Sequence, residues 1–147
     1  MAGGKRFSFR ATVVVGNRTG KVGIGIAKGL DFTAAVEKAK RQAEKNVIVI
    51  PLTENRTIAY DVEAKYGAAR VRMKPAAKGH GLIAGGSVRV VLDLLGVKDI
   101  SAKIMGTTKN KLSNAMAAVK ALQMIRPRVR PVAQISAAVP ESPAPDA

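Results

Sequence analysis

Several residue types are absent or scarce in this 147-residue chain, and each shortage excludes a class of site. The chain has no cysteine, which excludes disulfide bonds and thiolate metal sites, and its single histidine excludes a multi-histidine metal site. Tryptophan is absent and aromatic residues make up only 3% of the chain, so few side chains could stack on nucleic-acid bases. No apolar run reaches the roughly 18 residues that a membrane helix needs, and residues 1–10 lack the apolar stretch of a signal peptide. We therefore expect a cytoplasmic protein with no metal, no other cofactor and no membrane association.

Positive charge is the most informative feature that the chain does have. Lys and Arg number 25 against 10 Asp and Glu, which gives a formal net charge of +15. The excess is +7 in residues 1–52, +7 in residues 53–124 and +1 in the remainder. Self-repulsion at this charge destabilises the free protein, and a polyanion would relieve it while releasing condensed counterions. We therefore expect a nucleic acid in contact with both segments, in preference to an anionic membrane or a merely soluble basic surface.

The first segment is predicted to fold as a β-β-α-β unit. Apolar and polar side chains alternate in two stretches on either side of a Gly-Asn turn, which predicts a hairpin. The expected elements are strands at residues 6–15, 21–28 and 47–50 and a helix whose apolar stripe runs from Phe32 to Ala43. In the second strand Gly23 and Gly25 share a face, which would let either RNA or the following helix approach closely.

The second segment is predicted to fold as a β-β-α-β-α unit after a polar connection at residues 53–56. Val88, Val91, Leu92 and Leu95 have the spacing of a buried helical stripe. The expected strands are residues 57–64, 69–74 and 97–105, and the expected helices are residues 86–95 and 112–122. The fold class is therefore α+β, with small domains at residues 1–52 and 57–124 and a disordered, proline-rich tail at residues 125–147.

Glycine-rich segments and paired carboxylates are the candidates for catalytic chemistry in this chain. Residues 16–21 have three residues between the glycines where a phosphate-binding loop has four, and they lead into a strand. Residues 79–87 do lead into a helix, so a small-molecule kinase is one candidate, although a tight passage against neighbouring backbone is favoured. Asp61 and Glu63 share a strand face with Lys65, which favours a solvated charge ladder over acid–base catalysis. We expect no enzyme, because no complete catalytic set emerges.

Motifs in both halves carry a family resemblance. The N-terminal motifs are Arg6-Phe7-Ser8-Phe9, Val13-Val14-Val15-Gly16, Gly20-Lys21-Val22-Gly23-Ile24-Gly25 and Lys28. The C-terminal motifs are Lys74-Pro75-Ala76, Gly79, Gly81, Ile83-Ala84-Gly85-Gly86, Arg89, Val91-Leu92, Leu95-Gly96 and Asp99-Ile100. In this order they resemble the family of the bacterial small-ribosomal-subunit protein five, and the match covers about residues 3–124.

The resemblance implies a structural protein of the 30S subunit. It implies an N-terminal domain similar to double-stranded RNA-binding domains and a C-terminal α/β domain with an unusual crossover. It implies contacts with 16S rRNA and with small-subunit proteins four and eight, a role in assembly and decoding accuracy, and no homo-oligomer. The loop with Gly3 and Gly4 would point toward the subunit head, near the path by which messenger RNA enters, and Gly81 and Arg89 would lie at the seam with protein four.

The sequence departs from the family pattern at three places. The arm and strand that usually precede the paired glycines are not in this chain, so either the N-terminal sheet is without its first strand or the start of the sequence is truncated. His80 stands where the family usually has Thr. Residues 107–112 and 115–118 also differ from the family, so the effect of these segments on partner contacts stays open.

Basic side chains on strand faces and in loops are the predicted RNA contacts. Arg6 and Arg10 share one strand face, and Arg70, Arg72 and Lys74 share another, by the period of two. Contacts of this kind reach phosphate and sugar, and they recognise A-form RNA by shape and 2′-hydroxyls. The alternatives are solubilising charge and a free-standing RNA-binding or nucleoid protein. The full predicted set is Lys5, Arg6, Arg10, Arg18, Lys21, Lys28, Arg70, Arg72, Lys74 and Lys78.

Overall fold

The computed structural model describes residues 3–54 and 56–126, which form two sheets and three helices. The first half contains β1 (Phe9–Gly16), β2 (Lys21–Gly29), α1 (Phe32–Lys45) and β3 (Ile48–Val49). The second half contains β4 (Val62–Tyr66), β5 (Ala69–Pro75), β6 (Leu82–Ile83), α2 (Gly86–Leu95), β7 (Ile100–Ile104) and α3 (Lys111–Gln123). The predicted α+β class is confirmed.

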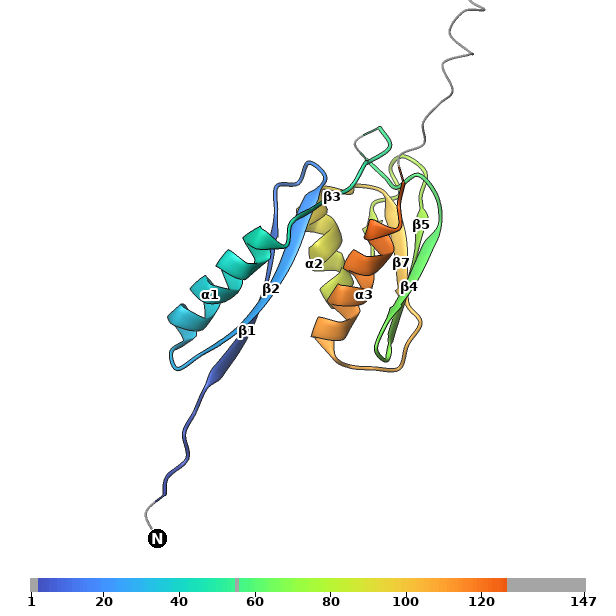
Figure 1. Cartoon of the computed structure of the whole chain (residues 1–147). Helices are drawn as coiled ribbons and strands as arrows, with labels where there is room; N and C mark the ends of the chain where they lie inside the picture. The colour runs from blue at the N-terminus through green and yellow to red at the C-terminus, as the bar shows by residue number, and fades with distance from the viewer. Residues whose placement is uncertain (1–2, 55, 127–147) are drawn as a thin grey trace, which may run out of the picture.

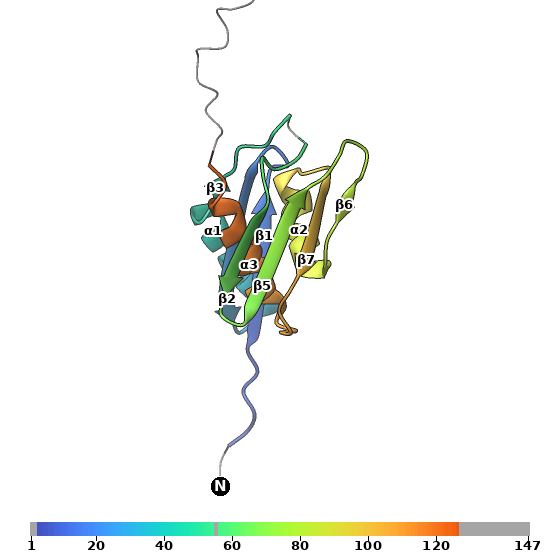
Figure 2. The same ribbon diagram turned by 90° about the vertical axis from the view of Figure 1, so that its right-hand side faces the viewer.

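The elements stack in four layers in the order helix, sheet, helices, sheet (Figure 1). α1 covers one face of the sheet β1-β2-β3, and α2 packs against β1 and β2 from the other side. α2 and α3 also cover one face of the second sheet, whose strand order is β4-β5-β7-β6. Its opposite face carries no helix within the described residues, as Figure 2 shows. None of the helices in this part of the chain has the length and apolar character needed to cross a bilayer.

The glycines of β2 face α1. Gly25 lies opposite Val13 in the antiparallel register, and a Cβ built on Gly25 would collide with the backbone of Ala39 and Ala43. Ala35, Ala39 and Ala43 form the buried stripe of α1. Because the residues on both facing surfaces are small, the backbones of the helix and the strand approach each other closely and leave little void. Of the two partners that the sequence left open for this face, the helix is the one that occupies it.

The other face of the hairpin contributes to the core of the second half. Val22 and Ile24 of β2 belong to the same apolar cluster as Leu92 and Leu95 of α2 and Leu122 of α3. The predicted stripe of α2 is buried along its whole length. The two halves therefore share one continuous core, in addition to the alanine contact that α1 makes with β2 within the first half.

Backbone hydrogen bonds also join the halves. The N–H of Arg18, in the turn between β1 and β2, donates to the carbonyl oxygen of Leu94 at 2.9 Å, and the N–H of Gly20 donates to that of Leu95 at 2.9 Å. These carbonyls lie in the last turn of α2 and have no partner inside the helix. Gly96 ends the helix in the left-handed region, with φ of 93°, directly against the Arg18 carbonyl. A side chain at Gly96 would both strain the backbone and push the halves apart.

Some element boundaries differ from the predictions. The strand predicted at residues 57–64 begins only at Val62, because Thr57 instead forms an isolated bridge with Thr53. The two-residue strand β6 pairs in parallel with β7 inside a glycine-rich stretch that was expected to be a loop. A parallel pairing of this length leaves no alternating pattern to detect.

The predicted tail also begins later than expected. Ile125 was assigned to it but is only 6% exposed and belongs to the core cluster. Arg126 was also assigned to it, but its N–H donates to the hydroxyl oxygen of Tyr60 at 3.0 Å. The rest of that assignment, residues 127–147, lies outside the described residues.

Candidate nucleic-acid interface

Four exposed basic side chains border the open end of the β1–β2 hairpin. Lys5 and Arg6 lie in the segment before β1, Arg10 lies on β1, and Lys28 lies on β2. Arg10 is directly opposite Lys28 in the register. Within the described residues none of the four makes an ion pair, since the ion pairs there involve other arginines. Like charges opposite each other destabilise a strand pair, and an anion bound between them would reverse the sign of that interaction.

Arg18 and Lys21 lie at the other end of the hairpin. The guanidinium of Arg18 is 3.3 Å from the carboxylate of Asp93 near the C-terminus of α2, where positive charge is favourable. Lys21 is exposed at the start of β2. The structure therefore separates Arg18 and Lys21 from the four cations at the open end of the hairpin.

Gly3 and Gly4 lie in the exposed segment that precedes β1 and runs away from the body in Figure 1.

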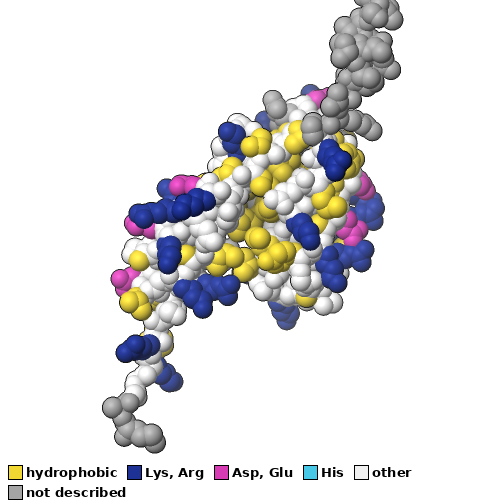
Figure 3. Space-filling model, in the orientation of Figure 1, with side chains coloured by type: hydrophobic (Ala, Val, Ile, Leu, Met, Phe, Trp, Pro, Cys, Tyr) yellow, Lys and Arg dark blue, Asp and Glu magenta, His cyan; other side chains and the backbone are white. Residues whose placement is uncertain are grey.

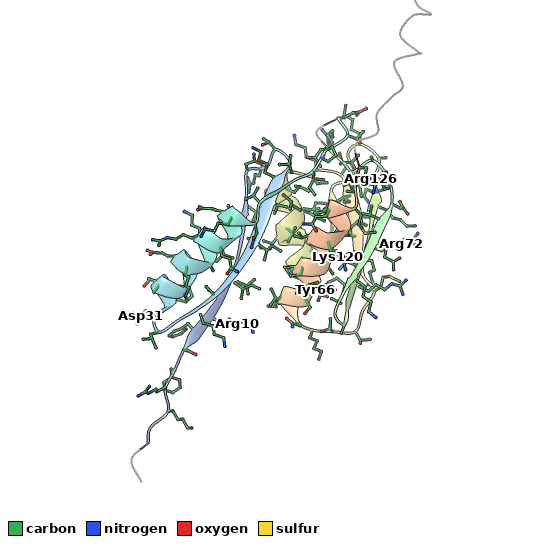
Figure 4. The ribbon with its side chains drawn as sticks, viewed as in Figure 1. Arg10, Asp31, Tyr66, Arg72, Lys120 and Arg126 are labelled. Atoms are coloured by element: carbon green, nitrogen blue, oxygen red, sulfur yellow. The ribbon has the colours of Figure 1, made fainter. Side chains whose placement is uncertain are left out.

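The uncovered face of the second sheet carries a mixed charge ladder. Arg70 donates to Glu63, and the guanidinium of Arg72, labelled in Figure 4, lies 3.4 Å from Asp61. Lys74 makes no ion pair with any residue that the structure describes. The predicted solvated ladder is confirmed, with the two carboxylates serving as partners for arginines. Its other outward basic side chains are Lys65 and Lys103.

A buried carboxylate occupies the anion position of the glycine-rich loop between β5 and β6. Oδ1 of Asp99 accepts hydrogen bonds from the N–H groups of Gly79 and Gly81, each at 3.0 Å, and Oδ2 accepts from Nε of Arg56 at 2.8 Å. Asp99 is only 2% exposed. Two N–H groups of the loop, those of Gly79 and Gly81, are therefore already used by a carboxylate, which argues against the kinase alternative. Across the described stretches, no group of three or more His, Cys, Asp or Glu residues could hold a metal ion.

The contacts of Asp99 favour its charged form. The N–H of Gly81 and the guanidinium of Arg56 lower the pKa of the Asp99 carboxyl below its ordinary value of 3.8, and burial opposes them. Arg56 belongs to the connection between the halves, and its carbonyl accepts hydrogen bonds from the N–H groups of Lys98 and Asp99. Asp99 therefore ties this connection to the Gly79–Gly81 loop. Sequence reasoning missed this role, because the partners of Asp99 are about 20 and 43 residues away.

The loop and α2 present the remaining predicted residues. Gly81 is half-buried with φ of 81°, while Lys78 and His80 are exposed beside it. Arg89 is exposed on α2. It helps to line a surface hollow together with Leu82, Val90, Asp93, Val97 and Lys98.

The two halves of the chain match two family models. The model described as "Ribosomal protein S5, N-terminal domain" matches residues 1–51, and the model described as "Ribosomal protein S5, C-terminal domain" matches residues 64–135. These matches fit the two-domain architecture that the sequence predicts.

Curated relatives agree with the family models. The chain is 51% identical over 124 residues to the small ribosomal subunit protein uS5 of Picosynechococcus sp., a match that covers 84% of this chain and 71% of the relative. It is 47% identical over 123 residues to the protein uS5c of Cyanidium caldarium, with coverage of 84% and 73%. It is 48% identical over 124 residues to the uS5 protein of Nostoc sp., with coverage of 84% and 71%. The chain belongs to the ribosomal protein S5 family, and it is accordingly a structural, non-enzymatic constituent of the small ribosomal subunit.

Proposed function

We propose that this chain binds 16S rRNA through exposed cations on both halves and helps to hold the folded RNA of the small subunit in place. The observation that carries the proposal is the cross-strand pair of Arg10 and Lys28, which are exposed, directly opposite each other and without an acidic partner in the described chain. A phosphate near both side chains would convert a repulsion into two attractions. Lys5 and Arg6 extend the same positive surface along the segment before β1.

The second half is proposed to contribute a further RNA surface on its uncovered sheet face and adjacent loop. Lys74 and Lys78 are exposed and are available to phosphates. Arg70 and Arg72 already interact with carboxylates, so a phosphate would compete with Glu63 and Asp61 for them. We therefore assign the larger share of phosphate binding to the hairpin end.

Finer roles follow the family resemblance. We propose that the chain packs against small-subunit proteins four and eight, with Gly81 and Arg89 at the seam with protein four, where it influences decoding accuracy. The segment with Gly3 and Gly4 is proposed to point toward the subunit head and the incoming messenger RNA. Residues 1–52 and 57–124 are proposed as the two domains, acting in assembly of ribosomes in the cytoplasm.

The salt dependence of RNA binding tests the central part of this proposal. The affinity of the full chain for 16S rRNA is measured by filter binding over a range of KCl concentrations. A double variant, Arg10→Gln with Lys28→Gln, is compared with a control, Arg41→Gln with Lys45→Gln. The control removes the same charge from α1, where Glu37 and Glu44 lie beside the cations. Both variants change only exposed side chains, so both should fold.

The slope of log affinity against log salt separates the outcomes. We expect the hairpin variant to flatten the slope by about 0.7 to 0.9 for each lost phosphate contact. The control should leave the slope nearly unchanged. Equal effects of the two variants would show that the hairpin end is only part of a diffuse positive surface, and would contradict the proposal.

A further inference from the structure

All three phenylalanines of the chain lie outside its core. Phe7 is 77% exposed, Phe9 48% and Phe32 64%, and the neighbouring Leu30 is 80% exposed. A folded protein normally buries such side chains, because full burial of one large apolar side chain is favourable and an exposed group of them marks an interaction site. The core instead uses aliphatic residues, alanine and Met73.

The phenylalanines gather at the open end of the β1–β2 hairpin. Phe9 begins β1 and pairs with Gly29 at the end of β2, and Phe32 is the first residue of α1. The ring centroids of Phe9 and Phe32 are 6.4 Å apart and their planes meet at 82°, an edge-to-face pair. Phe7 precedes Phe9 by two residues. We call Phe7, Phe9, Leu30 and Phe32 the aromatic end.

Charge identifies the kind of partner that fits the aromatic end. Lys5 and Arg6 lie in the segment that also carries Phe7, and Asp31 is the acidic residue that adjoins Leu30 and Phe32 in sequence. Arg10 and Lys28 lie at the same end of the hairpin but on the sheet face opposite Phe9, because Phe9 pairs with Gly29, which faces α1. Figure 4 labels Arg10 and Asp31 at this end, and Figure 3 shows hydrophobic side chains next to Lys and Arg there. Apolar rings among cations match a partner that has both flat apolar faces and negative charge.

We propose that the aromatic end is a stacking site for an unpaired base of RNA, with the flanking phosphates on Lys5 and Arg6. Bases within a continuous A-form duplex already stack on one another, so the ligand is a bulged or single-stranded nucleotide. Stacking on an aromatic side chain accepts any base, since every base has a π-face, and it releases no counterions. This inference rests on the proposed binding of rRNA and adds the structure of the RNA element that the N-terminal half selects.

Fluorescence of a modified RNA tests the site. The probe is an RNA hairpin with one bulged 2-aminopurine, compared with the same hairpin fully paired. Phe32→Leu keeps an apolar side chain of good helix propensity at an exposed position, so the full chain should fold, while Phe32→Tyr keeps the ring. We expect the wild-type chain to prefer the bulged RNA and to quench its 2-aminopurine.

The leucine variant should lose about 5- to 100-fold in affinity for the bulged RNA, together with the quenching, at an unchanged salt slope. The tyrosine variant should behave like the wild type. Equal binding of bulged and paired RNA by the wild type would overturn the inference and leave rRNA binding intact. Wild-type affinity in the leucine variant, or a dimer of the free chain that Phe32→Leu abolishes, would also overturn it. Failure of the wild type to bind either RNA would reject the proposed function itself.

Discussion

Arg10 and Lys28 lie directly opposite each other on β1 and β2, so the hairpin holds two positive charges at one cross-strand position. Lys28→Glu replaces this repulsion with an attraction. We expect the free chain to gain about 0.5 to 1 kcal/mol in free energy of unfolding, measured by urea titration. The same variant should bind 16S rRNA more weakly, because a phosphate site becomes repulsive.

Lys28→Gln is the matched control, since it removes the repulsion without adding an attraction. Its gain in stability should be smaller than that of Lys28→Glu. A glutamate variant that is less stable than the wild type, or that binds RNA with unchanged affinity, would contradict the role assigned to this pair.

Gly25→Ala should destabilise the first half by disturbing the contact between α1 and β2. The added methyl would meet the backbone of Ala39 and Ala43, which cannot move without shifting the helix. We expect a loss of about 2 kcal/mol or more, measured by urea unfolding. Gly86→Ala is the control, because a Cβ there meets open space at the first residue of α2, and alanine favours the helix. A loss as large in Gly86→Ala as in Gly25→Ala would remove close packing as the cause.

Asp99 predicts a specific dependence of stability on pH. Its pKa is lowered in the folded state, so its stabilising contribution is complete above the ordinary value of 3.8 and is lost as the pH falls through the lower folded value. We expect Asp99→Asn to lower the melting temperature at neutral pH and the difference from wild type to shrink below pH 3.8. Circular dichroism over a pH series measures both. Asp61→Asn removes a carboxylate from an exposed ion pair, so its melting temperature should differ little from that of the wild type at any pH. If the difference in melting temperature between Asp99→Asn and the wild type did not change with pH, the stabilising role of the ionised Asp99 would be refuted.

The cations on the second sheet should differ in their effect on RNA binding. Lys74 has no acidic partner among the described residues, whereas Arg72 is paired with Asp61. We expect Lys74→Gln to flatten the salt slope by about 0.7 to 0.9 and Arg72→Gln to flatten it less, since part of the charge of Arg72 is already neutralised. Filter binding of 16S rRNA gives both slopes. A larger effect at Arg72 would show that RNA displaces Asp61.

The helices could be predicted where burial follows one clear period. Val88, Val91, Leu92 and Leu95 have the spacing of one helix face, and all four are buried. Phe32 was expected in the buried stripe of α1 but is exposed, because it lies at the helix end where the hairpin stops. Periodicity shows on which face of a helix a residue lies. It does not show whether a neighbouring element extends far enough to cover that residue.

The candidate interface could be predicted only in part, because its geometry depends on partners far apart in sequence. Strand alternation placed Arg70, Arg72 and Lys74 on one face, and the structure agrees. It could not show that Asp99 fills the glycine-rich loop or that Arg18 meets α2, since both depend on how the halves pack. The exposed phenylalanines were likewise hidden, because their alternation is that of an ordinary buried strand.

A cryo-EM reconstruction of a small ribosomal subunit that contains this chain tests the central claim most directly. The account predicts RNA phosphates within hydrogen-bonding distance of Arg10 and Lys28, and RNA against the uncovered face of the second sheet. It would be contradicted by a reconstruction in which both of these surfaces face solvent with no nucleotide beside them.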